Sequence, residues 1–297
     1  MVELVYKIIT VFRVKCIFVS DLHGRIPRYE HLFIIIRQEM PDAVFLGGDL
    51  LPLHLTHDST MEEFIEQVIL SNIKQIRKDT NDKTRFFIIL GNDDPRVYEP
   101  VFIKANEAGI LEYIHEKTIS YKKLYISGYA YVPPTPFHLK DWERYDISQF
   151  VDMGAVSPES GIRTVEVPLD EIKYSTIAED LEKLSKNSPM TKTIFLFHSP
   201  PYHSCLDQAD LHGKKVDHAP VDVHVGSVAI QRFIKSKQPL LTLHGHVHES
   251  AQITGWWKEK VDRTFSFTAA HDGPELAVVR FDTENLKNAT RELIAVS

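Results

Sequence analysis

Short apolar segments alternate along the chain with stretches in which apolar residues recur every three or four positions. The apolar segments are rich in β-branched and aromatic residues, as is typical of buried strands, and they cover residues 14–20, 43–46, 86–90, 193–197 and 240–243. The three- and four-residue spacing predicts helices over 60–76, 177–184 and 228–234. The first of these has a capping box in Thr60 and Glu63. This alternation predicts βαβ units and a largely parallel sheet.

The C-terminal part of the chain has a different pattern. Three strand-like segments follow one another at 264–268, 276–281 and 293–296, and they predict a second sheet that is mixed or antiparallel. A proline- and aromatic-rich stretch near 129–165 predicts an irregular loop or insertion. The apolar run at 8–12 is flanked by basic residues and predicts a strand, not a signal peptide. We expect residues 1–297 to form a single domain.

Composition narrows the class of partner. The 297 residues are 43% hydrophobic and carry a formal charge of −7, with no basic stripe that would neutralise a nucleic-acid backbone. Duplex nucleic acid is therefore not the expected partner, whereas a small anionic substrate is compatible with this charge. No apolar stretch is long enough to span a membrane, and two cysteines are too few for a disulfide framework. A reducing, cytoplasmic setting is expected, and the sequence does not indicate an oligomeric state.

Potential metal ligands stand where the five strands end. Because the carboxyl ends of parallel strands meet at one edge of a sheet, these side chains should converge there. Glycines precede several of them, which lets the backbone turn sharply off a strand. In an extended chain residues two apart point to the same side, so the Asp-x-His and His-x-His pairs should each face one cleft. The ligand candidates are Asp21, His23, Asp49, Asn92, His198, His246 and His248.

The order Asp-x-His, Gly-Gly-Asp, Gly-Asn-x-Asp, His and Gly-His-x-His resembles the calcineurin-like metallophosphoesterase superfamily, over residues 21–248. The resemblance implies an α/β fold, a four-layer αββα sandwich of two packed mixed sheets, with a two-metal site at the carboxyl ends of the strands. It implies one metal held by Asp21, His23 and His248. It implies a second metal held by Asn92, His198 and His246, with Asp49 bridging both.

The mixed nitrogen and oxygen ligands favour two divalent transition-metal ions, Mn, Fe, Zn or Co, over magnesium or calcium. Two such ions about 3.5–4 Å apart can hold a bridging hydroxide for attack on phosphorus. The predicted function is therefore hydrolysis of a small phosphodiester or phosphomonoester. Aromatic residues between Tyr129 and Tyr145 could form a wall for stacking a base, which would suit a nucleotide-derived substrate; the alternative is an insertion that packs on its own core.

One position departs from the family pattern. The family usually has histidine after the asparagine of its third motif, and here that position is Asp93. An aspartate there can assist catalysis if it is protonated or if it orients another group. Among the histidines that follow His198, His224 is the preferred replacement, because it precedes a helix whose free N–H groups could bind an anion. The other three are His203, His212 and His218.

Three further residues lie near these motifs in the sequence. His244 adjoins the last motif, but its place predicts a structural role. Arg25 and Arg28 could contact phosphate. The alternative to a hydrolase is a metallophosphoesterase fold that serves as a protein-interaction scaffold, which the change at Asp93 leaves open. A nuclease is disfavoured by the acidic charge.

Overall fold

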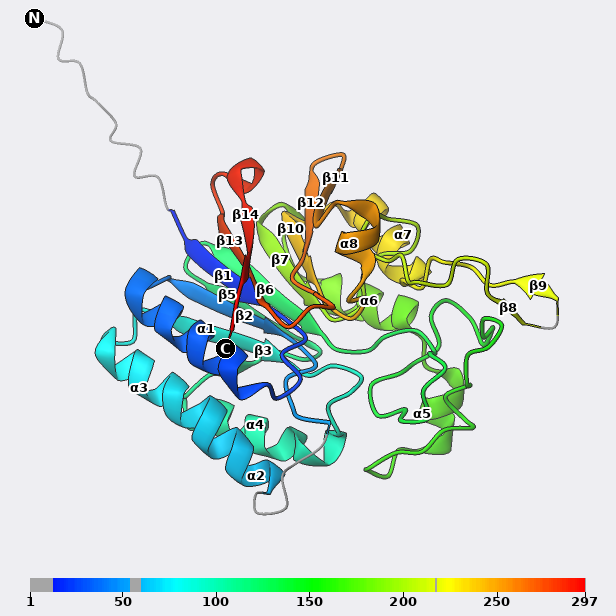
Figure 1. Ribbon diagram of the computed structural model, residues 1–297, viewed down its shortest axis with the longest axis horizontal. Helices are drawn as coiled ribbons and strands as arrows, with labels where there is room; N and C mark the ends of the chain where they lie inside the picture. The colour runs from blue at the N-terminus through cyan, green and yellow to red at the C-terminus, as the bar shows by residue number, and fades with distance from the viewer. Residues whose placement is uncertain (1–12, 54–59, 217, 297) are drawn as a thin grey trace, which may run out of the picture.

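The computed structural model describes residues 13–53, 60–216 and 218–296 (Figure 1). Two six-stranded mixed sheets lie face to face with helices on their outer sides, so the chain has the αββα layers implied by its motifs. The predicted strand at 8–12 lies outside the described residues. Within those residues, no helix is both long and apolar enough to cross a lipid bilayer.

The first sheet has the order β14-β13-β1-β2-β3-β4. Its four parallel strands are β1 Lys15–Val19, β2 Ala43–Gly47, β3 Arg85–Ile89 and β4 Glu112–Tyr113, and the first three of them lead into the first three motifs. Two antiparallel strands from the end of the chain complete it, β13 Leu276–Asp282 and β14 Thr290–Ile294.

The second sheet has the order β11-β12-β10-β7-β6-β5. Its parallel strands are β6 Leu124–Tyr129, β7 Thr193–Phe197, β10 Leu241–His244 and β12 Thr264–Thr268. Antiparallel strands form both edges, β5 Lys117–Tyr121 and β11 Lys258–Val261. The prediction that the three C-terminal segments share one sheet is wrong, because β12 pairs with β10 whereas β13 crosses over to pair with β1.

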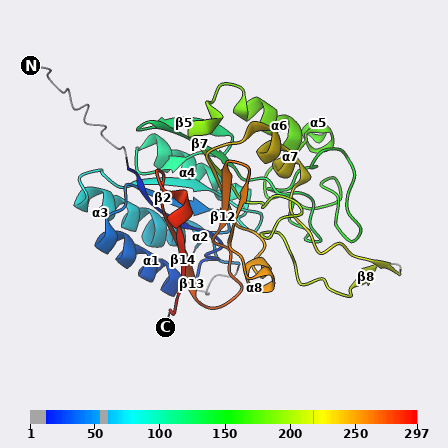
Figure 2. The ribbon, with the colours of Figure 1, turned by 90° about the horizontal axis from the view of Figure 1, so that it is seen from above.

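Helices cover the outer face of each sheet (Figures 1 and 2). The first sheet is covered by α1 Ile26–Glu39, α4 Glu99–Glu107 and a continuous helix made of α2 Met61–Phe64, the π-helical η1 Ile65–Leu70 and α3 Ser71–Asp79. The second is covered by α6 Ile177–Ser185 and α7 Val228–Lys237. The predicted capping box is present, with Glu63 N donating to Thr60 Oγ1 over 3.1 Å. The predicted helices over 60–76, 177–184 and 228–234 are confirmed.

Short elements fill the remaining connections, and they lie outside the two sheets. They are η2 Arg96–Tyr98, α5 Leu169–Tyr174, η3 Met190–Lys192, the hairpin of β8 Lys215–Val216 and β9 Ala219–Pro220, α8 Ser250–Thr254 and η4 Leu286–Asn288. Residues 130–168 contain neither a helix nor a regular strand, as their prolines predicted.

Aromatic rings fill the space between the two sheets. Phe45 of β2 stacks on Phe87 of β3 and on Phe281 of β13, with ring centroids 5.2 and 6.0 Å apart. Phe281 in turn meets Phe267 of β12, across the layer, at 5.9 Å. All four side chains are buried. Burial of this apolar surface holds the two sheets at a fixed separation.

Candidate metal centre

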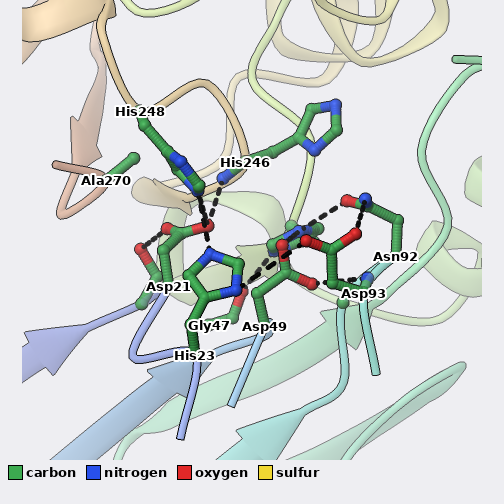
Figure 3. A network of polar contacts seen from close by, with 12 residues as sticks. Asp21, His23, Gly47, Asp49, Asn92, Asp93, His246, His248 and Ala270 are labelled. Carbon is green, nitrogen blue, oxygen red and sulfur yellow. Dashed lines mark hydrogen bonds and ion pairs between the residues drawn. The ribbon is translucent and has the colours of Figure 1, made fainter. Parts of the chain in front are cut away.

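The seven predicted ligands meet at the carboxyl edge shared by the two sheets (Figure 3). Asp21 and His23 follow β1, Asp49 follows β2 and Asn92 follows β3, all in the first sheet. The second sheet contributes the others from the loops after β7 and β10, namely His198, His246 and His248. The order of the strands thus brings residues scattered over most of the sequence to the same edge.

The ligand atoms form two groups with one member in common. Asp21, His23, Asp49 and His248 each offer an atom within 4.8 Å of the others. Asp49 belongs equally to a second such group with His198 and His246. Asn92 joins the second group, because its Oδ1 lies 3.0 Å from His198 Nε2. Two neighbouring cation sites that share one carboxylate fit this arrangement.

The backbone brings the ligands together in a way that the motif spacing does not indicate. Asp21, His23, Asp49 and His246 have φ angles of 56°, 46°, 52° and 73°. These are left-handed conformations, uncommon for residues other than glycine and concentrated at functional sites. The expectation of extended Asp-x-His and His-x-His pairs is therefore wrong. Tight turns aim the side chains, and the Asp21 turn is held by its N–H donating to Gly48 O over 3.0 Å.

Two glycines are required for this close approach. A Cβ on Gly48, whose φ is 93°, would lie 2.6 Å from His198 Nδ1. A Cβ on Gly91 would lie 2.3 Å from Asp49 Oδ1. Both distances are below normal van der Waals contact, so any larger residue would displace a ligand.

Asp94 ties the ligand loops together, a role that the sequence did not lead us to expect. Its fully buried carboxylate accepts hydrogen bonds from the backbone N–H groups of Leu50, Leu51 and Gly91, over 2.7 to 3.1 Å. It thereby joins the loop after β2 to the loop after β3. Trp142 donates its indole N–H to Asp94 O over 2.7 Å, which docks the 130–168 segment on the same loop. The sequence signal that could have indicated this role is the pair of adjacent acidic residues, Asp93 and Asp94, directly after Gly91-Asn92.

The histidine nitrogens are arranged to receive cations. His198 Nδ1 lies 2.7 Å from Gly47 O, and a carbonyl can only accept, so Nδ1 carries hydrogen and Nε2 is the ligating atom. His23 Nε2 and His248 Nε2 lie 3.1 Å apart, a distance suited to two ligands of one ion. His23 Nδ1 is buried without a hydrogen-bond partner among the described residues. The donor set therefore fits divalent metal ions.

The carboxylates at the centre favour cations, whereas His198 must lose a proton before it binds one. Burial opposes ionisation of Asp49, but His198 outweighs it and lowers the pKa of that carboxyl. Burial likewise disfavours a charged His198, yet Asp49 raises its pKa to about 10. Burial lowers the pKa of His246 to about 3, so this ring is neutral at physiological pH. Ionised carboxylates beside a neutral imidazole are the forms that bind metals.

The two predicted catalytic residues lie in different surroundings. Asp93 is at the centre: its N–H donates to Asp49 Oδ1 over 2.8 Å, and burial together with Asp49 raises its pKa to about 7. His224 makes no contact with the seven ligands in the described part of the chain. Its Nδ1 lies 2.8 Å from the buried Asp207, and its ring stacks on His203 with centroids 4.4 Å apart. A catalytic role for His224 stays a prediction.

The predicted anion site at the start of α7 is wrong. Asp146 accepts hydrogen bonds from Ser227 Oγ and from the N–H groups of Val228 and Ala229, at 2.5, 2.7 and 3.2 Å. A carboxylate of the chain itself therefore occupies the positive end of the helix, where an anionic ligand would bind.

Other residues near the motifs have structural roles. His244 is buried between Ser199 O and Thr242 Oγ1, at 2.9 and 2.7 Å, consistent with its prediction. Arg28 does not face the cleft: it is buried and donates to Asp21 O and to the Gly273 carbonyl. The exposed Arg25 reaches Gly273 O over 3.4 Å. His212 and His218 are the two remaining candidates, and both are exposed.

Most aromatic rings of this segment are buried. Tyr129, Tyr131, Trp142 and Tyr145 are at most 3% exposed. The first three surround the buried His115, with ring centroids 4.9 to 6.0 Å from it. These four rings pack in the core, as the alternative predicts, and do not form a base-stacking wall, whereas Phe137 is 60% exposed.

Comparison with known proteins bears on the family and the fold of the chain. A family model described as calcineurin-like phosphoesterase matches residues 14–250. The fold is similar to that of TT1561 of Thermus thermophilus, with a TM-score of 0.56 and 16% identity, over 95% of this chain and 99% of that one. A dimetal phosphatase from Danio rerio matches with a TM-score of 0.48 and 11% identity, over 96% of this chain and 99% of its own. A comparison with curated proteins gave no match.

Proposed function

The chain belongs to the calcineurin-like phosphoesterase family, and from that premise we propose that it hydrolyses phosphoesters at a two-metal centre. One observation supports this proposal above all others. Two groups of ligand atoms, each within 4.8 Å, share Asp49. A single shared carboxylate between two nitrogen-rich groups is the arrangement that a pair of divalent ions requires.

We assign one ion to Asp21, His23 and His248 and the other to Asn92, His198 and His246, with Asp49 between them. Mn, Fe, Zn or Co suits these ligands. When bound, the pair of ions supplies Lewis acidity toward phosphoryl oxygens and lowers the pKa of water. The ligand carboxylates Asp21 and Asp49, with an ionised Asp93 beside them, would bring three negative charges against four positive charges, which leaves the site attractive to an anion although the protein carries −7 overall.

The chain's own groups hold this centre rigid. The Asp93 N–H fixes one oxygen of Asp49, and the Gly47 carbonyl fixes the His198 ring. Rigid ligands hold the reacting groups in the right geometry, and this lowers the activation barrier of the reaction. The proposed substrate is a small phosphodiester or phosphomonoester. We also propose a reducing compartment, since Cys16 and Cys205 are both free thiols.

Metal content and turnover test the proposal together. Purified protein should contain or take up close to two transition-metal ions per chain, and it should hydrolyse bis-(4-nitrophenyl) phosphate or 4-nitrophenyl phosphate with Mn²⁺. His246→Ala should lose the second ion and reduce turnover by at least about 10²-fold. Protein that binds no transition metal and hydrolyses neither ester would refute the proposal.

A scaffold function is the second candidate, and one observation supports it. In the described residues, the segment from 137 to 174 holds seven exposed large apolar side chains, namely Phe137, Ile147, Phe150, Met153, Ile162, Leu169 and Tyr174. Large exposed apolar patches mark protein-interaction sites. The scaffold function would be favoured by two results together: no metal-dependent hydrolysis by the wild type, and partner binding that is unchanged in His246→Ala.

A further inference from the structure

Asp93 contacts both halves of the proposed metal centre. Its carboxylate Oδ1 accepts a hydrogen bond from Asn92 Nδ2 over 3.0 Å, and its Oδ2 lies 3.7 Å from His23 Nδ1 (Figure 3). Its backbone N–H donates to Asp49, the shared ligand. One residue therefore touches a member of the first group, a member of the second and the carboxylate common to both.

The contact with Asn92 decides which end of that amide faces the centre. An asparagine side chain has an oxygen that can bind a cation and an NH₂ group that cannot. Asp93 Oδ1 holds the NH₂ group, and the Asn92 oxygen then points toward His198 Nε2, 3.0 Å away. Without that anchor the amide could rotate and present its NH₂ group to the ion.

The contact with His23 decides which ring nitrogen carries hydrogen. His23 Nε2 faces His248 Nε2 at 3.1 Å, whereas Nδ1 is buried and has no hydrogen-bond partner among the described residues. A carboxylate facing Nδ1 favours hydrogen on that atom, which leaves the lone pair of Nε2 free for a metal. A shift of about half an ångström would make the 3.7 Å approach a hydrogen bond.

We propose that Asp93 is a positioning residue that orients Asn92 and fixes the tautomer of His23, and not a proton donor to the leaving group. This inference rests on the proposed two-metal function. It also gives a reason for the departure from the family pattern. A neutral imidazole offers one acceptor nitrogen, whereas a carboxylate has two oxygens and can serve both ligands at once.

Metal binding by variants tests this role. Metal-free wild type, Asp93→Asn, Asp93→Ala and Asp93→His would be titrated with Co²⁺, with calorimetry and visible absorption as readouts. Loss of the Asp93 carboxylate, which holds two metal ligands, should weaken Co²⁺ binding roughly 10–100-fold. It should also change the Co²⁺ absorption bands, because the ligand geometry changes. Asp93→Asn keeps one acceptor oxygen and can hold either Asn92 or His23 but not both, so its loss of affinity should lie between wild type and Asp93→Ala.

Asp272→Asn is the matched control. Asp272 is exposed, and it lies beside Gly273, whose carbonyl holds Arg28 near the centre. In the described part of the chain it makes no hydrogen bond or ion pair with the seven ligands. Removing this charge should change Co²⁺ affinity by less than about twofold. Thermal unfolding of each metal-free variant shows whether the variant is folded, and so separates a local effect on metal binding from misfolding. Asp93→Asn is the variant least expected to misfold, because it preserves the shape of the side chain.

The outcomes are distinct. Unchanged Co²⁺ affinity and spectrum in both Asp93→Asn and Asp93→Ala would overturn the inference. So would an Asp93→His variant that binds Co²⁺ as wild type does and hydrolyses esters with poor leaving groups faster. Failure of the proposed function shows separately, as wild-type protein that binds no pair of ions.

Discussion

At the scale of single residues, His198 shows how the centre is tuned. Its ring is fully buried, with Gly47 O on one side and Asp49 Oδ2 and Asn92 Oδ1 on the other, at 3.2 and 3.0 Å. Without metal, a proton on Nε2 satisfies both oxygens. A cation must displace that proton in order to bind.

Metal affinity is therefore expected to rise with pH. Burial opposes protonation, but Asp49 raises the pKa of His198 to about 10 and Asp21 raises that of His248 to about 9. Both values exceed the ordinary one, so both rings hold protons at neutral pH, and these protons compete with the metal. Between pH 7 and pH 9, affinity for Mn²⁺ should increase by up to about tenfold per pH unit for each proton displaced.

Calorimetry in buffers of different ionisation enthalpy measures this proton release directly. His212→Gln, a change of an exposed histidine, should give the same pH dependence as wild type. An affinity that does not change over this range would show that neither ring is protonated in the metal-free protein.

Gly48 gives a second prediction at this scale. Gly48→Ala should lower stability by more than the roughly 1 kcal/mol of backbone strain and should also weaken metal binding, because the new methyl group meets His198. Gly109→Ala is the control, since Gly109 also has a positive φ, 68°, but has open space around its Cβ position. Thermal unfolding and Co²⁺ titration of the two variants distinguish strain from collision. Equal effects would contradict the proposed contact.

The sequence predicted which residues are ligands, but not how the backbone positions them. The ligand positions followed from motif order. The left-handed turns at Asp21 and His246 did not, because a backbone angle depends on hydrogen bonds to distant loops. The role of Asp94 was hidden for the same reason, since its partners Leu50 and Leu51 are more than 40 residues away.

At the scale of elements, local signals predicted helices well and sheet membership poorly. Thr60 and Glu63 mark the start of a helix because their contacts span only three residues. In contrast, β13 pairs with β1 across nearly the whole length of the chain. No local pattern specifies a partner at that distance, and so the predicted grouping of the C-terminal strands was wrong.

The cap of α7 gives a prediction at this scale. Asp146→Ala leaves Ser227, Val228 and Ala229 without their acceptor and should destabilise the protein by roughly 1–2 kcal/mol. Co²⁺ affinity should not change, because the cap does not contact the ligands. Thr176→Ala, which removes a single-bond cap from α6, is the comparison and should cost about 1 kcal/mol or less. A large loss of metal affinity in Asp146→Ala would show that α7 supports the centre.

At the scale of the whole molecule, the proposed ions join the two sheets. The first sheet supplies Asp21, His23, Asp49 and Asn92, and the second supplies His198, His246 and His248. Each proposed ion has ligands from both sheets. Metal binding should therefore stabilise the complete fold and not one loop.

Removing the metal should lower the thermal stability of the protein. Free metal at about 100 times its dissociation constant adds about 2.7 kcal/mol for each site. Unfolding scans of wild type with Mn²⁺ and after chelation should differ by several degrees, whereas His246→Ala should show a smaller difference. Identical unfolding of metal-loaded and chelated wild type would contradict metal bridging between the sheets.

The rings of Phe45, Phe281 and Phe267, the first two stacked and the last edge-on to Phe281, lie in the layer that separates the two ligand-bearing sheets. The thickness of that layer fixes how far the loops of one sheet stand from those of the other. Interior residues that never meet a substrate thus act as a spacer for the chemistry above them. Because each proposed ion takes ligands from both sheets, resizing one of these phenyl rings should change the distances among the ligands of each ion without any substitution at the seven ligands themselves.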